Sequence, residues 1–97
     1  MITSFGDKGT SDLFHGISSR RRARKIPGQI HELALYKLDV LNAAQVLDDL
    51  RSPPGNRLEP LKGELKGFHS IRINSQWRII FRWAEGSATN VRIVDYH

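Results

Sequence analysis

The sequence predicts an α+β fold in which a short N-terminal strand is followed by two to three helices packed on one face of a mostly antiparallel sheet. In the first half of the chain, apolar residues recur every three or four positions, which is the period of an amphipathic helix. After a helix-breaking segment at residues 52–56, apolar and polar residues alternate, as in a half-buried strand. The 97 residues, 39% of them hydrophobic, suffice for a single domain over residues 1–97.

The first 25 residues are expected to form a short strand, a short helix and a charged loop. Residues 2–5 are a short alternating stretch that suits a strand. Residues 10–12 offer side-chain oxygens that can cap a short helix, and Gly16 is its natural stop. Five of the six residues 20–25 are Arg or Lys, and because like charges repel, we rank a flexible, solvated loop first for this run.

A longer helix is expected next. Pro27 suits its first turn, where a missing N–H leaves no hydrogen bond unmade. Apolar residues at intervals of three and four then form one stripe: Ile30, Leu33, Ala34, Leu38 and Leu41. Residues 42–45 (Asn-Ala-Ala-Gln) are typical of a capping box and predict a second, slightly kinked helix over residues 46–50, which ends at the prolines of residues 52–56.

Residues 70–94 are expected to form three antiparallel strands joined by two turns. The strands are residues 70–73, 77–83 and 91–94, and the turns are residues 74–76 and 85–87. If the first turn has three residues, the apolar side chains share one face: Ile71, Ile73, Trp77, Ile79, Phe81 and Trp83. Arg72, Arg78 and Arg82 then lie together on the opposite face, whereas a two-residue turn would separate them.

The charge balance points to an anionic partner. Fifteen Lys and Arg against ten Asp and Glu give a net charge of +5, and most of the excess lies after residue 50. Basic proteins gain affinity for nucleic acids by releasing counterions from phosphates, although many basic proteins bind none. The absence of cysteine excludes a disulfide scaffold, and no segment has the length of a membrane span or the pattern of a signal peptide. We therefore expect a cytoplasmic protein with no membrane partner.

Ionisable side chains gather in two places of the C-terminal half. The chain ends in Asp95, Tyr96 and His97, an acid, a phenol and an imidazole that directly follow a predicted strand. The face that carries Arg72, Arg78 and Arg82 is called the arginine face below. The loop before the sheet adds further groups to it: Arg57, Lys62, Lys66 and His69. Two plainer interpretations stay open at this point, namely a strand that stops in polar residues and a solvated polar face.

Together these groups meet the needs of RNA cleavage without a metal. The 2′-hydroxyl must lose a proton, the pentacoordinate phosphate must be neutralised, and the leaving 5′-oxygen must gain a proton. Arginine suits the second task, and the ionisable residues of the tail suit the other two. The histidines show no metal-ligand spacing, so we expect neither a metal site nor a cofactor.

Four motifs follow one another along the C-terminal half of the chain: Leu-Glu-Pro-Leu-Lys-Gly at residues 58–63, His-Ser-Ile-Arg-Ile at 69–73, Gln-Trp-Arg-Ile at 76–79 and Asp-Tyr-His at 95–97. Together they resemble the HigB toxins of the RelE/ParE superfamily of toxin–antitoxin systems. The opening residues 1–5 and Leu-Asp-Asp-Leu at 47–50 are similar to the same group, so the resemblance covers nearly the whole chain. It implies a RelE-like fold.

The resemblance implies the toxin of a type II toxin–antitoxin system that is a metal-independent, ribosome-dependent mRNA endoribonuclease, or mRNA interferase. Such a toxin enters the A site of the 30S subunit, cuts the codon there and inhibits translation. The resemblance also implies a HigA-type antitoxin with a helix-turn-helix fold, and operator DNA binding only through the toxin–antitoxin complex. For residues 20–25, the resemblance adds two alternatives to the solvated loop, namely contact with ribosomal RNA and contact with the antitoxin.

By the same resemblance, Arg78 stabilises the phosphate in the transition state, residues 95–97 form a catalytic tail, and Lys62 handles a phosphate or a proton. Some family members have a histidine where this chain has Glu59, which can act as a base but not as a cation. Alternatively, Glu59 is a loop carboxylate paired with Arg57 or Lys62. The expected RNA-binding residues are Arg57, Lys66, His69, Arg72, Arg82 and Arg92.

Two other functions compete with cleavage. A non-catalytic or gyrase-directed, ParE-like protein would act with its antitoxin as a transcriptional regulator. A plain RNA-binding module would bind free RNA in a salt-dependent manner. The acid, phenol and imidazole at the end of the chain favour the endoribonuclease, because neither alternative gives them a role.

Overall fold

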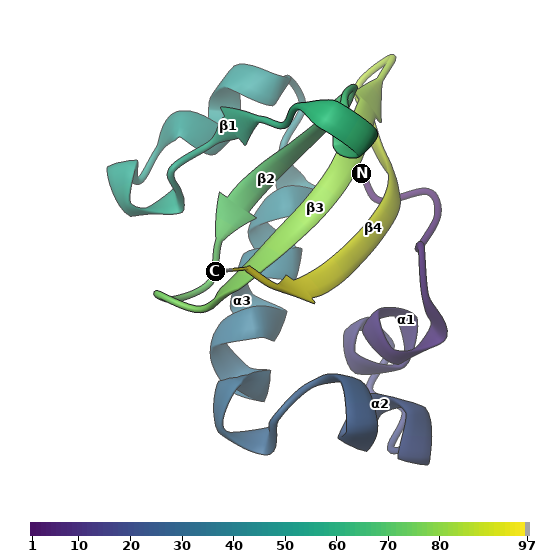
Figure 1. The fold of residues 1–97 in the computed structure, drawn as a ribbon. Coiled ribbons are helices and arrows are strands. Elements are labelled where there is room, and N and C mark those ends of the chain that lie inside the picture. Colours follow the sequence, from purple (N-terminus) through teal and green to yellow (C-terminus); the bar gives the residue numbers. More distant parts are fainter. Residues whose placement is uncertain (97) are drawn as a thin grey trace.

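A four-stranded antiparallel sheet with the strand order β1-β2-β3-β4 forms one layer of the fold (Figure 1). The computed structural model describes residues 1–96. Its strands are β1 (Glu59–Pro60), β2 (Phe68–Arg72), β3 (Trp77–Ala84) and β4 (Ser87–Asp95). Its α-helices are α1 (Lys8–Phe14), α2 (Arg20–Lys25) and α3 (His31–Ala43). Helix α3 lies behind one face of the sheet, and α1 packs against α2, α3 and β4, so the predicted α+β class is confirmed.

The turn between β2 and β3 decides which side chains share a face of the sheet. The two strands pair with Arg72 opposite Arg78. The N–H of Ile73 donates to the carbonyl of Trp77 at 2.9 Å, which leaves three residues in the turn. The predicted three-residue turn is therefore confirmed. Because side chains alternate along each strand, Arg72, Arg78 and Arg82 lie on the same face.

Strand β4 is longer than predicted and starts at the preceding turn rather than at Val91. Ala84 pairs with Ser87, so only Glu85 and Gly86 form the turn, with φ angles of 53° and 77°. Two positive φ angles are typical of a tight hairpin turn. A register shift between β3 and β4, as at a bulge, interrupts the alternation of apolar residues, which is why the sequence pattern concealed the first half of β4.

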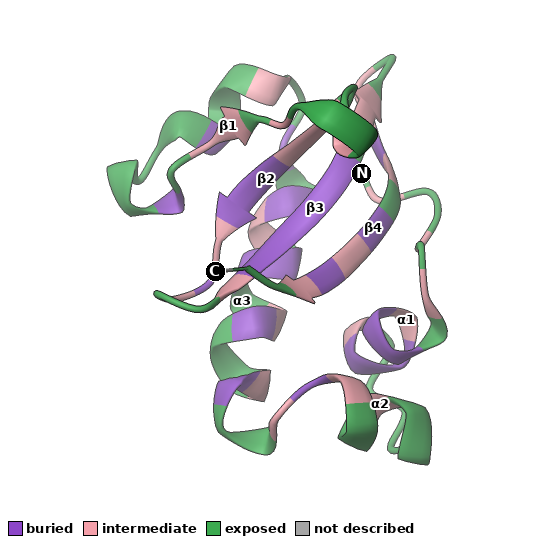
Figure 2. Cartoon of the chain, in the orientation of Figure 1, coloured by how far each residue is buried: buried purple, intermediate pink, exposed green. Residues whose placement is uncertain are grey.

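Buried residues of the sheet and of α3 form the hydrophobic core, and Figure 2 shows where they lie along these elements. Its fully buried side chains from the sheet are Ile71, Ile79, Phe81, Ala88, Val91 and Ile93. Helix α3 contributes Ala34, Leu38 and Leu41, and Trp77 and Trp83 pack against this core as partly buried side chains. Burying each large apolar side chain contributes about 1.5–3 kcal/mol, so the face of the sheet that carries them is held against α3 and the arginine face is turned away from it.

The buried stripe of α3 differs from the predicted one at two positions. Leu33 is 41% exposed, so its assignment to the buried stripe is wrong, whereas Lys37 is only 8% exposed. With 3.6 residues per turn, position 37 falls in line with Ala34 and Leu41, while position 33 falls at the margin of the stripe. A lysine therefore occupies a place in the core-facing stripe of α3.

The predicted N-terminal strand is reduced to two isolated bridges. Ile2 pairs with Ala88 and Phe5 with Val91, both in parallel, along the outer edge of β4. The intervening backbone also hydrogen-bonds to β4, from the N–H of Thr3 to the carbonyl of Ala88. This segment covers an edge strand that would otherwise present unpaired backbone groups.

Helix α1 begins earlier than predicted. Asp7, not a residue at 10–12, caps it by accepting a hydrogen bond from the backbone N–H of Thr10 at 2.7 Å. Asp12 is instead a buried residue of the helix, whose carboxylate accepts from Ser19 at 2.6 Å. Gly16 follows the helix with a φ of 72°, which fits its predicted role as the stop.

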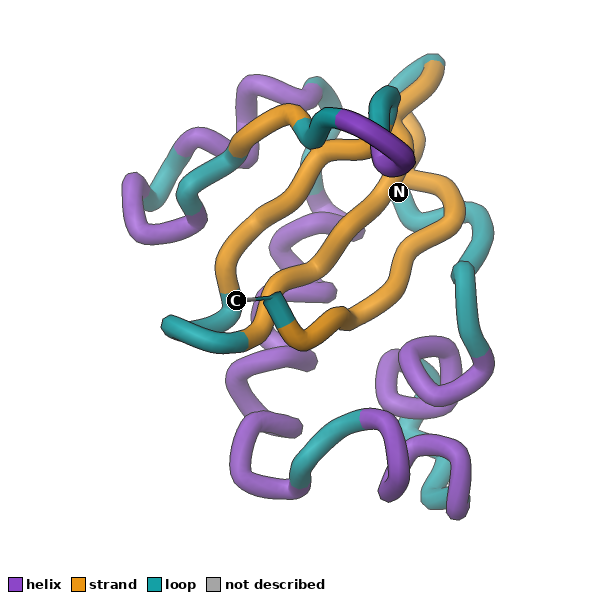
Figure 3. Tube along the Cα trace, viewed as in Figure 1, coloured by secondary structure: helices purple, strands orange, loops and turns teal. Residues whose placement is uncertain are grey.

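Residues 20–25 form helix α2, so the predicted loop is wrong (Figure 3). Ser19 caps the helix by accepting from the N–H of Arg22. Asp12 pairs with Arg21 at 3.1 Å and Asp7 pairs with Lys25 at 3.2 Å. Two aspartates of the α1 segment thus reduce the repulsion among the cations of α2, and neither aspartate is close to α2 in sequence.

The capping box predicted at residues 42–45 is also wrong. Asn42 accepts a hydrogen bond from the N–H of Ile2, and Asp49 accepts from the N–H groups of Gln45 and Val46. These two backbone donors hold the pKa of Asp49 below its ordinary value. The following segments are short 3₁₀ helices, Leu47–Arg51 and Pro54–Asn56, rather than a second α-helix. Within residues 1–96, no helix has the length and apolarity needed to cross a membrane.

Candidate functional site

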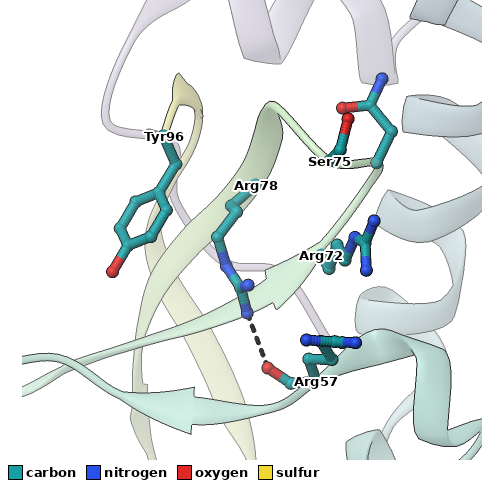
Figure 4. Close-up of a pocket in the computed structure, with 6 residues that line it drawn as sticks. Arg57, Arg72, Ser75, Arg78 and Tyr96 are labelled. Atoms are coloured by element: carbon teal, nitrogen blue, oxygen red, sulfur yellow. Dashed lines mark hydrogen bonds between the residues drawn. The ribbon is translucent and has the colours of Figure 1, made fainter.

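The candidate site lies on the sheet face that points away from α3, where the β2–β3 turn meets the end of β4 (Figure 4). A hollow of about 380 Å³ opens there. Its lining residues are Arg57, Arg72, Asn74, Ser75, Arg78 and Tyr96. Three arginines from three separate segments therefore face one small volume, as expected of a site for an anion.

Arg78 is the most firmly held of these arginines and is only 7% exposed. Its Nε donates to the hydroxyl of Ser70 at 2.8 Å, and its Nη2 donates to the carbonyl of Arg57 at 2.6 Å. Its Nη1 lies 3.5 Å from the carboxylate of Glu59. Because two nitrogens are bound to fixed oxygens, the plane of the guanidinium is set before any ligand arrives.

The charge of Arg78 is poorly solvated. Burial lowers the pKa of its guanidinium, while Glu59 and Tyr96 raise it. Arginine nevertheless stays cationic at neutral pH, because its ordinary pKa exceeds about 12. A buried cation held mainly by neutral oxygens gains more from a bound anion than an exposed cation does, since little water screens the interaction.

Tyr96 lines two hollows. Its ring centre lies 5.5 Å from the guanidinium carbon of Arg78, and its backbone N–H donates to the carbonyl of Gln76 at 2.7 Å. Tyr96 also lines a second hollow of about 390 Å³, together with Glu59 and Lys62. The phenol is thus shared by an arginine-lined hollow and by one that holds a carboxylate and an amine.

Glu59 takes a position that the sequence did not suggest. It lies opposite Ser70 in the β1–β2 pair, which brings its carboxylate beside Arg78. The predicted alternative, an ion pair with Arg57 or Lys62, is therefore wrong within the described residues. The Glu59 side chain is 47% exposed, so it remains open to solvent and to a ligand.

Two expected site residues lie on the other face of the sheet. Asp95 is opposite Trp77 on the core face, and its carboxylate accepts a hydrogen bond from the side chain of Gln76 at 3.1 Å. His69 is opposite Phe81 and stacks on its ring, with centres 6.0 Å apart. Alternation along the strands separates both residues from the arginine face.

Three other expected residues lie outside both hollows. Arg82 is on the arginine face but farther along β3, with its guanidinium carbon 4.6 Å from the ring centre of Phe68. Lys66 is exposed after the 3₁₀ helix Gly63–Leu65, and Arg92 is half-buried in β4. His97, expected in the catalytic tail, lies outside the described residues.

Two functional groups were missed by the sequence reasoning. Ser70 is fully buried and binds Arg78, and the alternation of β2 could have placed it on the arginine face with Arg72. The second group is the backbone carbonyl of Arg57, for which the sequence carries no signal. Within residues 1–96, no cluster of three or more His, Cys, Asp or Glu side chains is placed to hold a metal ion.

The arrangement brings together the means to bind a phosphate and to move protons. A fixed guanidinium can stabilise negative charge that develops on a phosphate. A carboxylate can accept a proton, and a phenol or an ammonium can donate one. These groups line two hollows that meet at one side chain, Tyr96.

Comparisons with known proteins show what this chain is similar to. A family model described as the RelE-like toxin of the type II toxin–antitoxin system HigB matches residues 3–97. The chain is 46% identical over 90 residues to Toxin HigB-1 of Vibrio cholerae, covering 93% of this chain and 92% of that protein. It is 33% identical, over an alignment of 98 residues that covers 100% of both chains, to Endoribonuclease HigB of Proteus vulgaris.

Solved structures share the fold at low sequence identity. A YafQ mutant from E. coli matches with a TM-score of 0.60 and 15% identity, covering 98% of this chain and 93% of that one. The YoeB–YefM complex from Staphylococcus aureus contains a chain that matches with a TM-score of 0.60 and 13% identity, covering 100% of this chain and 98% of that one. The expected RelE-like fold is therefore confirmed.

Proposed function

The chain belongs to the HigB family of RelE-like toxins of type II toxin–antitoxin systems, and we propose that it is an endoribonuclease that cuts mRNA in the ribosomal A site and thereby inhibits translation. The name of the Proteus vulgaris relative supports RNA cleavage. The observation that carries the proposal is Arg78, a buried guanidinium fixed by neutral oxygens and open to a hollow that also holds a phenol.

In the proposed reaction, the 2′-hydroxyl of the RNA attacks the adjacent phosphorus. The bond to the 5′-oxygen breaks, and the products are a 2′,3′-cyclic phosphate and a free 5′-hydroxyl. The pentacoordinate phosphate carries extra negative charge, which Arg78 stabilises from its fixed position. Nε and Nη2 already bind Ser70 and Arg57, so we assign this contact to Nη1, which lies 3.5 Å from the Glu59 carboxylate.

Two proton transfers complete the reaction. We assign the first to Glu59, whose carboxylate lies 3.5 Å from Arg78 and accepts the proton of the 2′-hydroxyl. Tyr96, whose ring centre lies 5.5 Å from the guanidinium carbon, donates a proton to the leaving 5′-oxygen. Lys62 lines the hollow of Glu59 and stabilises a flanking phosphate. The proposal includes His97 in the tail, and it requires no metal or cofactor.

The proposed partners follow from the family and the charge. A net charge of +5 favours association with ribosomal RNA and mRNA, whose phosphates attract cations over a distance. As a toxin of a type II system, the protein is proposed to act in the cytoplasm and to bind a HigA-type helix-turn-helix antitoxin. Operator DNA is bound only through that complex.

Primer-extension mapping tests the proposal. A defined mRNA is translated on purified ribosomes with and without the protein, whose C-terminus carries no tag. We expect cuts within the codon in the A site, only when ribosomes are present. Arg78→Ala should abolish these cuts, and Arg24→Ala, an arginine exposed on α2, should retain them.

Two results would reject the proposal: no cleavage at any codon, or unchanged cleavage by Arg78→Ala. A DNA supercoiling assay with purified gyrase would follow, because inhibition there would assign the protein to the gyrase-directed alternative. Cleavage of free RNA without ribosomes would retain the nuclease and reject its dependence on the ribosome.

A further inference from the structure

Lys37 and Asn56 form a buried polar pair between α3 and the segment before β1. Lys37 is 8% exposed and Asn56 is fully buried. The Lys37 ammonium donates to the side-chain oxygen of Asn56 at 2.5 Å, and no ion pair among residues 1–96 includes Lys37. Burial of an ammonium is unfavourable unless it is well compensated, so this pair is a poor source of stability.

The side chain of Asn56 makes three hydrogen bonds, two as donor and one as acceptor. Its oxygen accepts from Lys37, and its amide nitrogen donates to the carbonyls of Leu50 and Ser52, both at 3.2 Å. Its backbone N–H donates to the carbonyl of Pro53 at 2.9 Å. Asn56 thereby joins α3 to two neighbouring turns and holds the backbone around itself in one conformation.

The residue after Asn56 provides the carbonyl that binds Arg78. Arg57 has a φ of 46°, in the left-handed region that non-glycine residues seldom occupy. Such a conformation is strained and persists where the surrounding structure imposes it. It directs the Arg57 carbonyl to Nη2 of Arg78, at 2.6 Å (Figure 4).

We propose that Asn56 and Lys37 are positioning residues for Arg78: the pair fixes the turn whose carbonyl holds the guanidinium in the geometry needed for the phosphate. This inference rests on the proposed function, since it assigns to Arg78 the transition-state contact. Without the Arg57 carbonyl, Ser70 alone would hold the guanidinium, and the Glu59 carboxylate 3.5 Å away would draw it aside. The effect should appear in catalysis rather than in ribosome binding.

The test compares Asn56→Ala with Asn42→Ala, which also removes a long-range side-chain hydrogen bond but lies away from the hollow. Nitrogen-15 NMR of the arginine side chains reports how firmly the Arg78 guanidinium is held in the free protein. We expect distinct, slowly exchanging Nη signals in the wild type and Asn42→Ala, and averaged signals in Asn56→Ala. On ribosomes, Asn56→Ala should lower kcat about 10- to 100-fold, with KM unchanged.

Lys37→Met serves as the second variant, because it keeps Asn56 and replaces the ammonium with an apolar chain of similar length. We expect the same changes in the Arg78 signals and in kcat, at smaller amplitude. If Asn56→Ala does not fold, Lys37→Met decides whether the pair positions Arg78. Thermal unfolding of every variant sets a temperature at which all are folded.

Unchanged Arg78 signals in a folded variant would overturn the inference, whatever the activity. Averaged signals with an unchanged kcat would overturn the catalytic part. Wild-type protein that cuts no mRNA would instead reject the proposed function, and the NMR result would still decide whether Asn56 and Lys37 position Arg78.

Discussion

Arginine appears in two contrasting settings in this protein, the hollow around Arg78 and the helix α2. Arg78 is 7% exposed and its nitrogens are bound by Ser70 and Arg57, whereas the side chain of Arg21 on α2 is 59% exposed and pairs with Asp12. The first cation is fixed and poorly screened, and the second lies in solvent, where salt screens charges within about 8–10 Å. The comparison separates a cation whose proposed role depends on its fixed position from cations whose expected role depends on long-range electrostatic attraction.

The largest expected effect is at Arg78. Arg78→Ala should lower the rate of ribosome-dependent cleavage by about 10²–10³-fold, because it removes the fixed donor to the transition state. Arg78→Lys should restore little of this rate, since an ammonium cannot reproduce the contacts of the guanidinium fork. Single-turnover cleavage measures both, with Arg24→Ala as the matched exposed arginine. Equal losses of cleavage rate in Arg78→Ala and Arg24→Ala would show that the two settings do not differ in their effect on cleavage.

Glu59 comes next, because it is the acidic neighbour of the fixed cation. Glu59→Gln should lower kcat about 100-fold if the carboxylate is the general base, and it should remove one limb of the pH–rate profile. Glu59→His should recover much of the rate, since imidazole can also accept a proton. A faster Glu59→Gln enzyme would show instead that Glu59 competes with the substrate phosphate for Arg78.

A smaller, salt-dependent effect is expected on α2. The double variant Arg20→Gln with Arg24→Gln should raise KM for programmed ribosomes a few-fold at low salt and leave kcat unchanged. The difference should vanish at high salt, because the affected interaction is screened. Binding of the antitoxin is measured in parallel by calorimetry. A loss confined to antitoxin affinity would assign α2 to that partner rather than to RNA.

The smallest expected effect is on thermal stability, at Asp12, which pairs with Arg21 of α2. The hydroxyl of Ser19 and the guanidinium of Arg21 hold the pKa of Asp12 below its ordinary value of 3.8. The unfolded chain therefore binds more protons at this site, so the stabilisation is present above that value and is lost as the pH falls through the folded-state pKa.

Asp12→Asn should consequently lower the melting temperature at neutral pH and match the wild type in acid. Thermal unfolding followed by circular dichroism at pH values from about 7 down to about 2.5 measures this convergence. A constant difference between the two proteins at all pH values would show that the charge of Asp12 is not what stabilises α2.

Local spacing predicted the class of the fold and, on the condition of a three-residue turn, the face of the sheet that bears the arginines. The period of two in β2 and β3, with a three-residue turn between them, places Arg72 and Arg78 opposite each other in any antiparallel pair. The same reasoning placed Tyr96 near the end of a strand. These features depend on neighbours in sequence, and the amino-acid order therefore contains them.

Contacts between distant segments decided the remainder. The cations of α2 are paired with Asp7 and Asp12 of the α1 segment, and Arg78 is held by a carbonyl 21 residues earlier in the chain. Conversely, Asp95 belongs to the predicted tail but lies on the core face of the sheet. A hydrogen bond forms only where packing brings donor and acceptor together. Because every residue has the same backbone carbonyl, the sequence does not indicate which carbonyl binds Arg78. The sequence could therefore name Arg78, and only the packed chain shows what orients it.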